Sequence, residues 1–265
     1  RDLVRSRGLG DVYKRQHVSF AYPEAGENVL TDISFKAKKG QTIAVIGSTG
    51  SGKSTLINLI PRYYDVTKGS VKVDGVDVRD MTQKELRDKL GYVPQKGVLF
   101  SGTIDSNIRY GKPEITDAQV KEAAEVAQAT EFIDTKPEKY ESPVSQGGTN
   151  VSGGQKQRLS IARAIAKDPE IFIFDDSFSA LDFKTDSQLR KALKEYTKDA
   201  TTVIVAQRIS TILGADQIIV LDDGHMAGIG THKELMANCE VYQQIARSQL
   251  SVSYTHLTLP TILRV

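Results

Sequence analysis

The hydrophobic residues of this chain are gathered in short continuous runs, three of which cover residues 43–46, 171–174 and 218–221. Runs of this length predict strands that are buried on both faces, as in a parallel sheet. Residues 120–127 instead carry apolar side chains at helical spacing. Residues 217–221 and 226–229 flank an Asp-Asp-Gly turn, which predicts a hairpin. Together these patterns predict an α/β fold.

Length and composition agree with a globular domain. The 265 residues suffice for one large domain or two small ones. Hydrophobic residues make up 39% of the chain, so we expect a packed core. The net charge is only +2, so the overall charge gives no reason to expect a nucleic acid partner. No apolar run approaches the roughly 18 residues of a membrane span. The single cysteine, Cys239, excludes an internal disulfide, and we expect a small buried side chain there rather than a reactive thiol.

Both ends of the chain look foreign to the protein. Residues 6–16 (SRGLGDVYKRQ) and 252–261 (VSYTHLTLPT) can be back-translated into the adapters of a transposase-based sequencing library. A natural disordered tail is the alternative for each end. We therefore expect residues 1–16 and 251–265 to be adapter-derived, and the protein itself to occupy residues 17–250. Since the chain does not begin with Met, we also expect it to be a piece of a longer gene product.

A glycine-rich segment follows the first apolar run. Residues 47–55 read GSTGSGKST and lie between a predicted strand and an apolar helix pattern, which is the context that a phosphate-binding loop requires. Glycines let backbone N–H groups turn toward phosphate oxygens, and the helix N-terminus adds partial positive charge. The predicted nucleotide-binding residues here are Gly47, Ser48, Thr49, Gly50, Ser51, Gly52, Lys53, Ser54 and Thr55.

Specific roles follow for a few side chains at this site. Lys53 would offset the charge of the β- and γ-phosphates, and the Ser54 hydroxyl would ligate Mg²⁺. The run 171–174 ends in Asp175 and Asp176. A carboxylate at the carboxyl end of a buried strand, beside such a loop, can hold Mg²⁺, so Asp175 is a predicted metal ligand. Without the loop, a strand-to-helix turn with a helix cap would explain the two residues equally well.

Residues 151–165, VSGGQKQRLSIARAI, resemble the signature motif of ABC transporters. A Ser-Gly-Gly turn that opens a helix forms an anion site, although taken alone it fits an ordinary capped helix. In the ABC family this motif binds the γ-phosphate of the ATP that the partner subunit holds. The resemblance therefore implies nucleotide contacts from Ser152, Gly153, Gly154 and Gln155.

Other segments resemble the same family across residues 17–250. Tyr22, in VSFAYP, is similar to the aromatic residue that stacks on adenine, with a core aromatic as the alternative. Gln95, in GYVPQ, is similar to the Q-loop glutamine, which contacts Mg²⁺ and the attacking water. Residues 100–111 resemble the exporter form of the following segment, and residues 179–182 (SALD) match the D-loop.

The resemblance implies an architecture and a cellular setting. It implies a P-loop NTPase (RecA-like) parallel-sheet core, an antiparallel β subdomain near residues 17–40 and 70–77, and an inserted α-helical subdomain at about residues 98–166. The implied cofactors are ATP and Mg²⁺. The implied partners are a second nucleotide-binding domain and the transmembrane domains of the same parent chain. The chain would then lie at the cytoplasmic face of a cell membrane, the inner membrane of a bacterium.

Two positions depart from the family pattern. Asp176 stands where the family usually has Glu, and Gln207 stands where it usually has His. Because Asp is one methylene shorter, its carboxylate would fall back from the water that a general base must reach. Gln207 can hydrogen-bond a phosphate but has no titratable proton. With Gln95, these are the predicted catalytic residues, and we expect ATP binding to survive and hydrolysis to be weak.

The signature is intact apart from Val151 in place of the usual Leu, whereas the loop before it has Gln146 and Gly147 in place of Glu and Arg. A poor site combined with a good signature resembles the degenerate-site half of a heterodimeric exporter. Two alternatives stay open. One is a homodimeric exporter with two slow sites. The other is a non-transport ABC ATPase acting on DNA or ribosomes, which the exporter-like segment disfavours.

Overall fold

The computed structural model describes residues 13–255, and its largest sheet has six strands in the order β12-β11-β3-β10-β9-β6. Neighbouring strands from β11 to β6 pair in parallel, while β12 pairs antiparallel with β11. The predicted parallel sheet and the predicted hairpin are therefore confirmed. The strands are β3 (Thr42–Gly47), β6 (Leu90–Val93), β9 (Ile171–Asp175), β10 (Thr201–Val205), β11 (Gln217–Asp222) and β12 (His225–Gly230).

A second, antiparallel sheet has the order β2-β1-β4-β5 and matches the predicted antiparallel layer. Its strands are β1 (Tyr13–Phe20), β2 (Leu30–Ala37), β4 (Lys68–Val73) and β5 (Val76–Asp77). Strand β1 begins four residues before the predicted start of the protein. Residues 13–15 pair with both β2 and β4, and Gln16 pairs with β4. Helix α10 (Glu240–Thr255) likewise runs past residue 250. Residues 1–12 and 256–265 lie outside the described residues, and the adapter origin of the ends stays a prediction.

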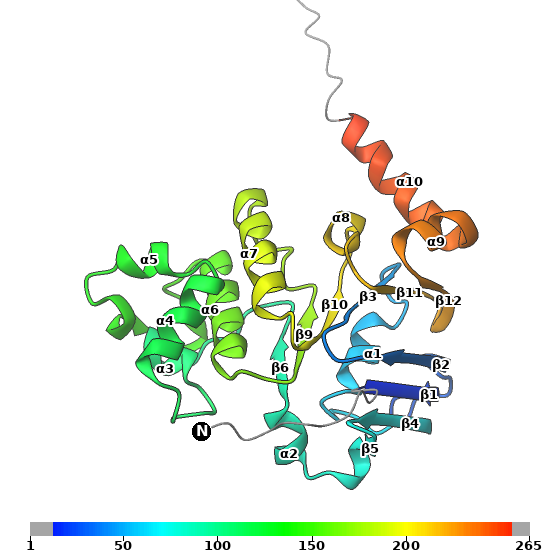
Figure 1. The fold of residues 1–265 in the computed structure, drawn as a ribbon, viewed down its shortest axis with the longest axis horizontal. Helices are drawn as coiled ribbons and strands as arrows, with labels where there is room; N and C mark the ends of the chain where they lie inside the picture. The colour runs from blue at the N-terminus through cyan, green and yellow to red at the C-terminus, as the bar shows by residue number, and fades with distance from the viewer. Residues whose placement is uncertain (1–12, 256–265) are drawn as a thin grey trace, which may run out of the picture.

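The segment predicted as a helical subdomain contains four α-helices. Figure 1 shows them gathered at one end of the molecule, away from the antiparallel sheet. They are α3 (Ile104–Ile108), α4 (Asp117–Val126), α5 (Thr130–Asp134) and α6 (Gly153–Ala166), with the short strands β7 (Gly102–Thr103) and β8 (Pro143–Val144). The other helices are α1 (Lys53–Asn58), α2 (Gln83–Asp88), α7 (Phe183–Tyr196), α8 (Ile209–Ile212) and α9 (His232–Asn238).

The central strands are covered on both faces. In β3, Ile43 and Val45 join a core with the antiparallel sheet and α1, whereas Ala44 and Ile46 join a core with α8, α9 and α10. Successive side chains of a strand point to opposite faces, so both faces of β3 need apolar residues. Strand β9 divides its side chains in the same way, between the first core and the core of the helical subdomain. This double covering explains the continuous apolar runs in the sequence.

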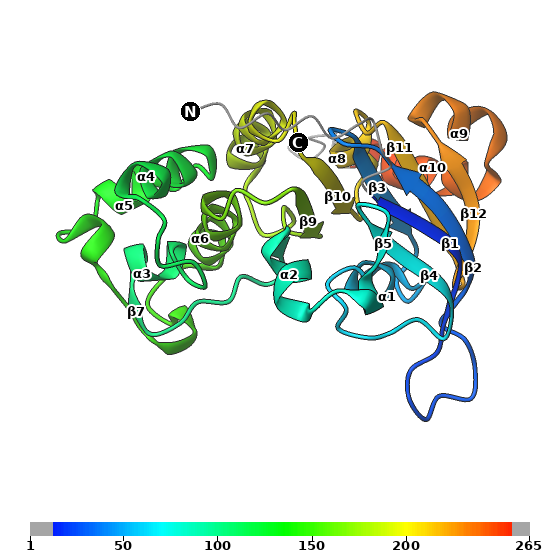
Figure 2. The same ribbon diagram turned by 60° about the horizontal axis from the view of Figure 1, so that its bottom comes forward.

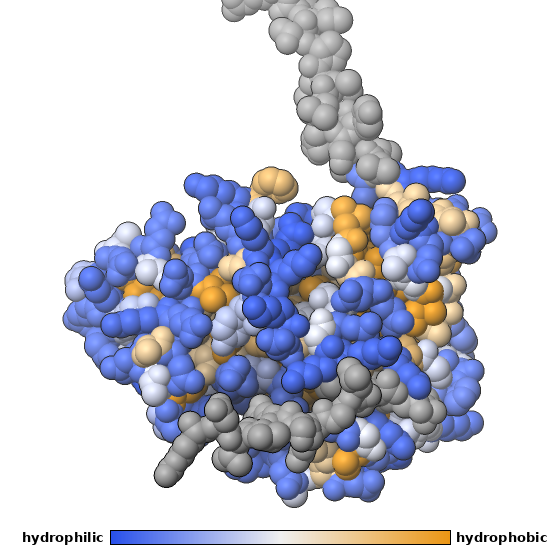
Figure 3. Space-filling view, viewed as in Figure 1, coloured by the Kyte–Doolittle hydropathy of each residue, from blue (hydrophilic) through white to orange (hydrophobic). Residues whose placement is uncertain are grey.

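The surface of the described part is mostly polar. Figure 3 shows one face, on which hydrophobic side chains form small separate areas among hydrophilic ones. Scattered exposure of this kind is ordinary for a folded domain. Among the helices within residues 13–255, none has the length and apolar character needed to cross a membrane.

Candidate functional site

Three segments that are far apart in the sequence meet at one edge of the six-stranded sheet. Strand β10 lies between β3 and β9 and runs parallel to both. The phosphate loop follows β3, Asp176 follows β9, and Gln207 follows β10. Parallel strands present their carboxyl ends at the same edge, where ligand sites form in such sheets. The fold therefore brings the loop, the two aspartates and Gln207 together.

A pocket of about 280 Å³ opens at this edge. It is lined by Val29, Thr49, Gly50, Gly52, Lys53, Ser54, Thr55, Gln95, Asp175, Asp176, Val205 and Gln207. Apart from the two valines, each of these residues was among the predicted site residues. Tyr22, Gly47, Ser48, Ser51 and the signature residues are not among the lining residues. Their predicted roles, like those of the lining residues, stay predictions.

Glycine is required at two positions of the loop by close packing. Gly52 precedes α1 with φ 96, and a Cβ there would lie 2.7 Å from Leu30 Cδ2. A Cβ at Gly47 would overlap the carbonyl oxygen of Leu221. Helix α1 has no side-chain cap, so its first N–H groups remain available to an anion. The loop thus has the shape and the free donors of a phosphate site.

Lys53 is held by the loop itself. Its Nζ donates hydrogen bonds to the carbonyl oxygens of Gly47, at 2.8 Å, and Ser48, at 2.6 Å. Burial lowers the pKa of Lys53, although Asp176 and Asp175 oppose that shift by favouring the charged form. The ammonium group is therefore held at the pocket wall by two backbone carbonyl oxygens of the loop.

Asp175 and Ser54 form the predicted metal-binding pair. Ser54 Oγ donates a hydrogen bond to Asp175 Oδ1 at 3.2 Å, and the hydroxyl of Tyr92 approaches Asp175 Oδ2 at 3.4 Å. Burial raises the pKa of Asp175. Mg²⁺ is usually bound by one or two carboxylates together with waters and substrate phosphate oxygens. This pair of oxygen donors beside a phosphate loop therefore fits Mg²⁺.

Asp176 is engaged by two amide groups. Its Oδ2 accepts hydrogen bonds from Gln207 Nε2, at 2.7 Å, and from Gln95 Nε2, at 3.2 Å. Burial raises the pKa of Asp176, while the hydrogen bond from Gln95 opposes the shift. Two of the predicted catalytic residues, Gln95 and Gln207, thus both contact the third, Asp176. One carboxylate oxygen of Asp176 already has two donors within the chain.

Tyr22 lies at the junction of the antiparallel sheet and α1. Its hydroxyl is 2.9 Å from Thr55 Oγ1, and its ring meets Phe20 and Tyr64 nearly edge-on, at centroid distances of 4.9 and 5.2 Å. The side chain is partly buried against the core of this region. Packing alone therefore accounts for these contacts, and the stacking of adenine on Tyr22 stays a prediction.

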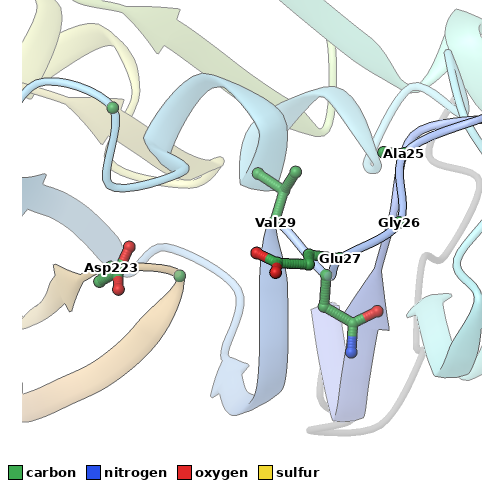
Figure 4. A pocket seen from close by; sticks show the side chains of 8 residues that line it. Ala25, Gly26, Glu27, Val29 and Asp223 are labelled. Atoms are coloured by element: carbon green, nitrogen blue, oxygen red, sulfur yellow. The ribbon is translucent and has the colours of Figure 1, made fainter.

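A second cavity, of about 500 Å³, adjoins the first and shares Val29 and Gly50 with it. The loop between β1 and β2, which projects beyond the sheet in Figure 2, forms one wall. The turn between β11 and β12 forms the other. Figure 4 shows Glu27 and Asp223 on these opposite walls. Sequence analysis did not predict this cavity, because neither wall carries a recognisable motif.

The signature residues begin helix α6. Ser152 Oγ accepts a hydrogen bond from the N–H of Gln155 at 3.2 Å, and Gln155 Oε1 accepts one from the N–H of Ser152 at 3.1 Å. This reciprocal pair is a capping box. Ser152 and Gly153 are exposed. The turn is therefore a well-formed helix start, and its residues are not among those that line the pocket.

Two polar residues near the pocket were not predicted. The Tyr92 hydroxyl donates toward Asn58 Oδ1 at 3.1 Å as well as toward Asp175. Burial, with the charge of Asp175 as a smaller cause, raises the pKa of Tyr92. Tyr92 stands three residues before Gln95 in the sequence, but its place beside Asp175 follows from the pairing of β6 with β9, which no sequence pattern predicted.

Comparisons with known proteins place this site in a family. Residues 30–179 match the family model described as ABC transporter. An "Uncharacterized ABC transporter ATP-binding protein" of Mycobacterium tuberculosis is 48% identical over 245 residues, which are 91% of this chain and 42% of the relative. A "Putative multidrug export ATP-binding/permease protein" of Staphylococcus aureus is 47% identical over 229 residues, which are 86% of this chain and 40% of the relative.

A solved structure of a bacterial Atm1-family ABC exporter with ATP bound has a TM-score of 0.86 and 38% identity to this chain. The match covers 89% of this chain and 42% of that one. The chain thus spans less than half the length of each of these proteins. Together with the phosphate loop and the aspartates at the sheet edge, these matches show that the chain belongs to the ABC transporter family, as an ATP-binding domain homologous to those of ABC exporters.

Proposed function

We propose that this chain is the ATP-binding part of an exporter subunit, in which binding and hydrolysis of ATP drive export across a membrane. The Staphylococcus aureus relative is named as a multidrug export ATP-binding/permease protein, and the matched solved structure is that of an exporter with ATP bound. Both are more than twice as long as the matched segment. The membrane-spanning part, and a location at the cytoplasmic face of a bacterial inner membrane, belong to this proposal.

Each side of the pocket has a task in binding MgATP. The N–H groups at the start of α1 and the ammonium of Lys53 would hold the phosphates, since both present positive charge to the pocket. Ser54 and Asp175 would hold Mg²⁺. When bound, Mg²⁺ offsets the negative charge that phosphoryl transfer concentrates on the phosphate oxygens. Gln95, which also lines the pocket, would contact the metal and the attacking water.

We further propose that hydrolysis at this site is impaired. The observation that carries this proposal is the short hydrogen bond from Gln207 Nε2 to Asp176 Oδ2, at 2.7 Å, with Gln95 as a second donor to the same oxygen. A general base must lie within about 2.6–3.2 Å of the water that it polarises. Asp176 has a short side chain, and one of its oxygens is occupied by two amides. It is therefore poorly placed to accept a proton from water.

The signature turn supports a partner domain. Ser152 and Gly153 are exposed and lie outside the pocket lining of this chain, so they are free to face a nucleotide held elsewhere. In the proposed heterodimer, a second nucleotide-binding domain provides a competent site that this signature completes. The two alternatives are a homodimer with two slow sites and a non-transport ATPase. Six membrane spans encoded upstream of residue 17 would exclude the non-transport ATPase.

Restoring the usual residues tests the proposal. The unmodified chain, concentrated enough to self-associate, should hydrolyse ATP very slowly, because both sites would then carry Asp176 and Gln207. The double variant Asp176→Glu with Gln207→His should raise steady-state turnover at least about tenfold, since a general base contributes roughly 10²–10⁴ in rate. Each single change should do less, because the two side chains act on one another.

A matched control makes the same two exchanges at exposed positions, Asp199→Glu with Gln244→His, and should leave turnover unchanged. Brisk hydrolysis by the unmodified chain, insensitive to the double change in the pocket, would contradict the impaired site and favour an ordinary homodimer.

A further inference from the structure

Tyr92 lies beside the predicted metal ligand on the neighbouring strand. Strands β6 and β9 are parallel, and Tyr92 is paired with Ile173, two residues before Asp175. Residues two apart on a strand share a face, so Tyr92, Ile173 and Asp175 lie on the same side of the sheet. Helix α1 packs on this side and contributes Ser54 and Asn58. The topology therefore brings a phenol from the strand before Gln95 to the metal pair.

We propose that Tyr92 is a positioning residue for the metal ligand Asp175 and so sets the affinity of this site for Mg²⁺. The inference rests on the proposed role of Asp175 as a Mg²⁺ ligand. The two oxygens of Asp175 have different partners: Ser54 Oγ donates to Oδ1 at 3.2 Å, and the Tyr92 hydroxyl approaches Oδ2 at 3.4 Å. Ser54 is itself assigned to the metal. Within residues 13–255, Tyr92 is therefore the side-chain donor to Asp175 that is not itself assigned to the metal.

The hydroxyl of Tyr92 is well suited to this role. Its ring is packed against the buried core and meets Tyr63 nearly edge-on at 5.8 Å, so the position of the oxygen is fixed by packing. The hydroxyl has one proton and two acceptors, Asn58 Oδ1 at 3.1 Å and Asp175 Oδ2 at 3.4 Å. Partners that orient a metal-ligating carboxylate typically change metal affinity 10–100-fold when they are mutated. The long contact to Asp175 places the expected effect at the low end of that range.

The test uses the whole 265-residue chain with Mn²⁺ as the probe metal, read by electron paramagnetic resonance of the free ion in the presence of ATP. Tyr92→Phe should weaken Mn²⁺ binding about tenfold. Affinity for ATP without metal, measured in a chelator, should change less than about twofold, because the loop and Lys53 do not involve this hydroxyl. Asn58→Ala removes the competing acceptor and should leave Mn²⁺ affinity unchanged or higher.

Tyr196→Phe is the matched control, because that hydroxyl bonds the carbonyl of Ile165 in the helical subdomain. It should not change Mn²⁺ affinity. Unchanged Mn²⁺ affinity in Tyr92→Phe, with ATP binding intact, would overturn the role of Tyr92 alone. So would an equal loss of metal-free ATP binding, or an equal loss of Mn²⁺ affinity in Asn58→Ala, since either indicates general packing. A wild-type chain that binds no ATP in either condition would overturn the proposed function as well.

Discussion

The phosphate loop and the signature turn both contain glycines and both lead into a helix, but the two helices are capped differently. Helix α1 begins after Gly52 with no side-chain cap. Helix α6 begins after Ser152 with a complete capping box, in which Ser152 and Gln155 satisfy each other's backbone N–H groups. The first helix start also has a cation, Lys53, bonded to the loop carbonyls, and lies in a pocket with two aspartates. The second is exposed.

This difference indicates how much of each anion site the chain supplies by itself. At α1 no side-chain cap is hydrogen-bonded to the first N–H groups, so a ligand can bind them without displacing a cap. At α6 the capping box already uses the N–H groups of Ser152 and Gln155. The N–H groups of Gly153 and Gly154 would therefore be the ones available to a phosphate. We therefore expect the isolated chain to bind nucleotide through its loop and to use its signature only together with a partner.

The largest effect is expected for Lys53→Ala. Hydrogen bonds to charged groups are worth about 1.5–3 kcal/mol, and no second cation lines the pocket among the described residues, so ATP affinity should fall about 100-fold. Titration with a fluorescent ATP analogue measures this. Lys191→Ala, at an exposed position on α7, removes the same charge away from the pocket and should have no effect. Unchanged affinity in Lys53→Ala would end the assignment of the phosphate loop.

The sequence predicted the sheet because its physical signals are local. Strands β3 and β9 are buried on both faces, so their apolar runs are continuous and easily recognised. The start of β1 was not predicted, because residues 13–16 were excluded as adapter-derived on the basis of their back-translation. Strand pairing depends on backbone groups that any residue except proline provides, so residues of foreign origin can still extend a strand. The predicted origin of residues 13–16 therefore gave no indication that they would pair as a strand.

The site was predictable where a motif has fixed spacing and unpredictable where contacts depend on packing. The spacing of Gly47, Gly52 and Lys53 follows from the shape of a phosphate, so the loop could be assigned directly. The contact of Gln207 with Asp176 depends on the register of β10 beside β9, which no local pattern specifies. The approach of Tyr92 to Asp175 likewise required the order of the strands. The sequence therefore predicts candidate residues, whose roles stay predictions, but not the contacts between their side chains.

A smaller effect is expected for Tyr22, which tests whether the loop receives help from the antiparallel sheet. Stacking of a base on an aromatic ring is worth about 1–3 kcal/mol, so Tyr22→Ala should weaken ATP binding about tenfold. Tyr22→Phe keeps the ring and loses the hydroxyl contact to Thr55, so it should bind ATP as the wild type does. Equal losses in both variants, measured by the same titration, would assign the effect to the hydroxyl or to the packing of this region.

Ser152→Ala examines the signature side of the comparison. Replacing a capping serine by alanine costs about 1 kcal/mol, so the midpoint of urea unfolding should fall modestly. ATP affinity of the isolated chain should not change, because Ser152 is not among the residues that line the pocket. Thr116→Ala is a matched control, since Thr116 caps α4 with the same kind of capping box and should cost the same stability. A loss of ATP affinity in Ser152→Ala alone would show that the signature acts within its own chain.

The smallest effect near neutral pH concerns the charges that surround the phosphate loop. Burial raises the pKa of Asp175 and lowers the pKa of Lys53. As pH falls toward the raised pKa, Asp175 takes up a proton, and the Mg²⁺ affinity proposed for it would be lost at a higher pH than for an ordinary aspartate. As pH rises toward the lowered pKa, Lys53 loses its charge and would lose the interaction with phosphate that is proposed for it. Affinity for MgATP should therefore be highest between the two pKa values and fall about tenfold per pH unit beyond either pKa, as expected for one proton.

Calorimetric titration of ATP between pH 5 and 10, with and without Mg²⁺, separates the two groups. The acid limb should vanish when Mg²⁺ is omitted, because Asp175 then has no metal to bind, and it should also vanish in Asp175→Asn. The alkaline limb should persist without metal, since Lys53 is expected to act on phosphate directly. An acid limb that survives both changes would show that another group, and not the Asp175 carboxylate, controls metal binding at this loop.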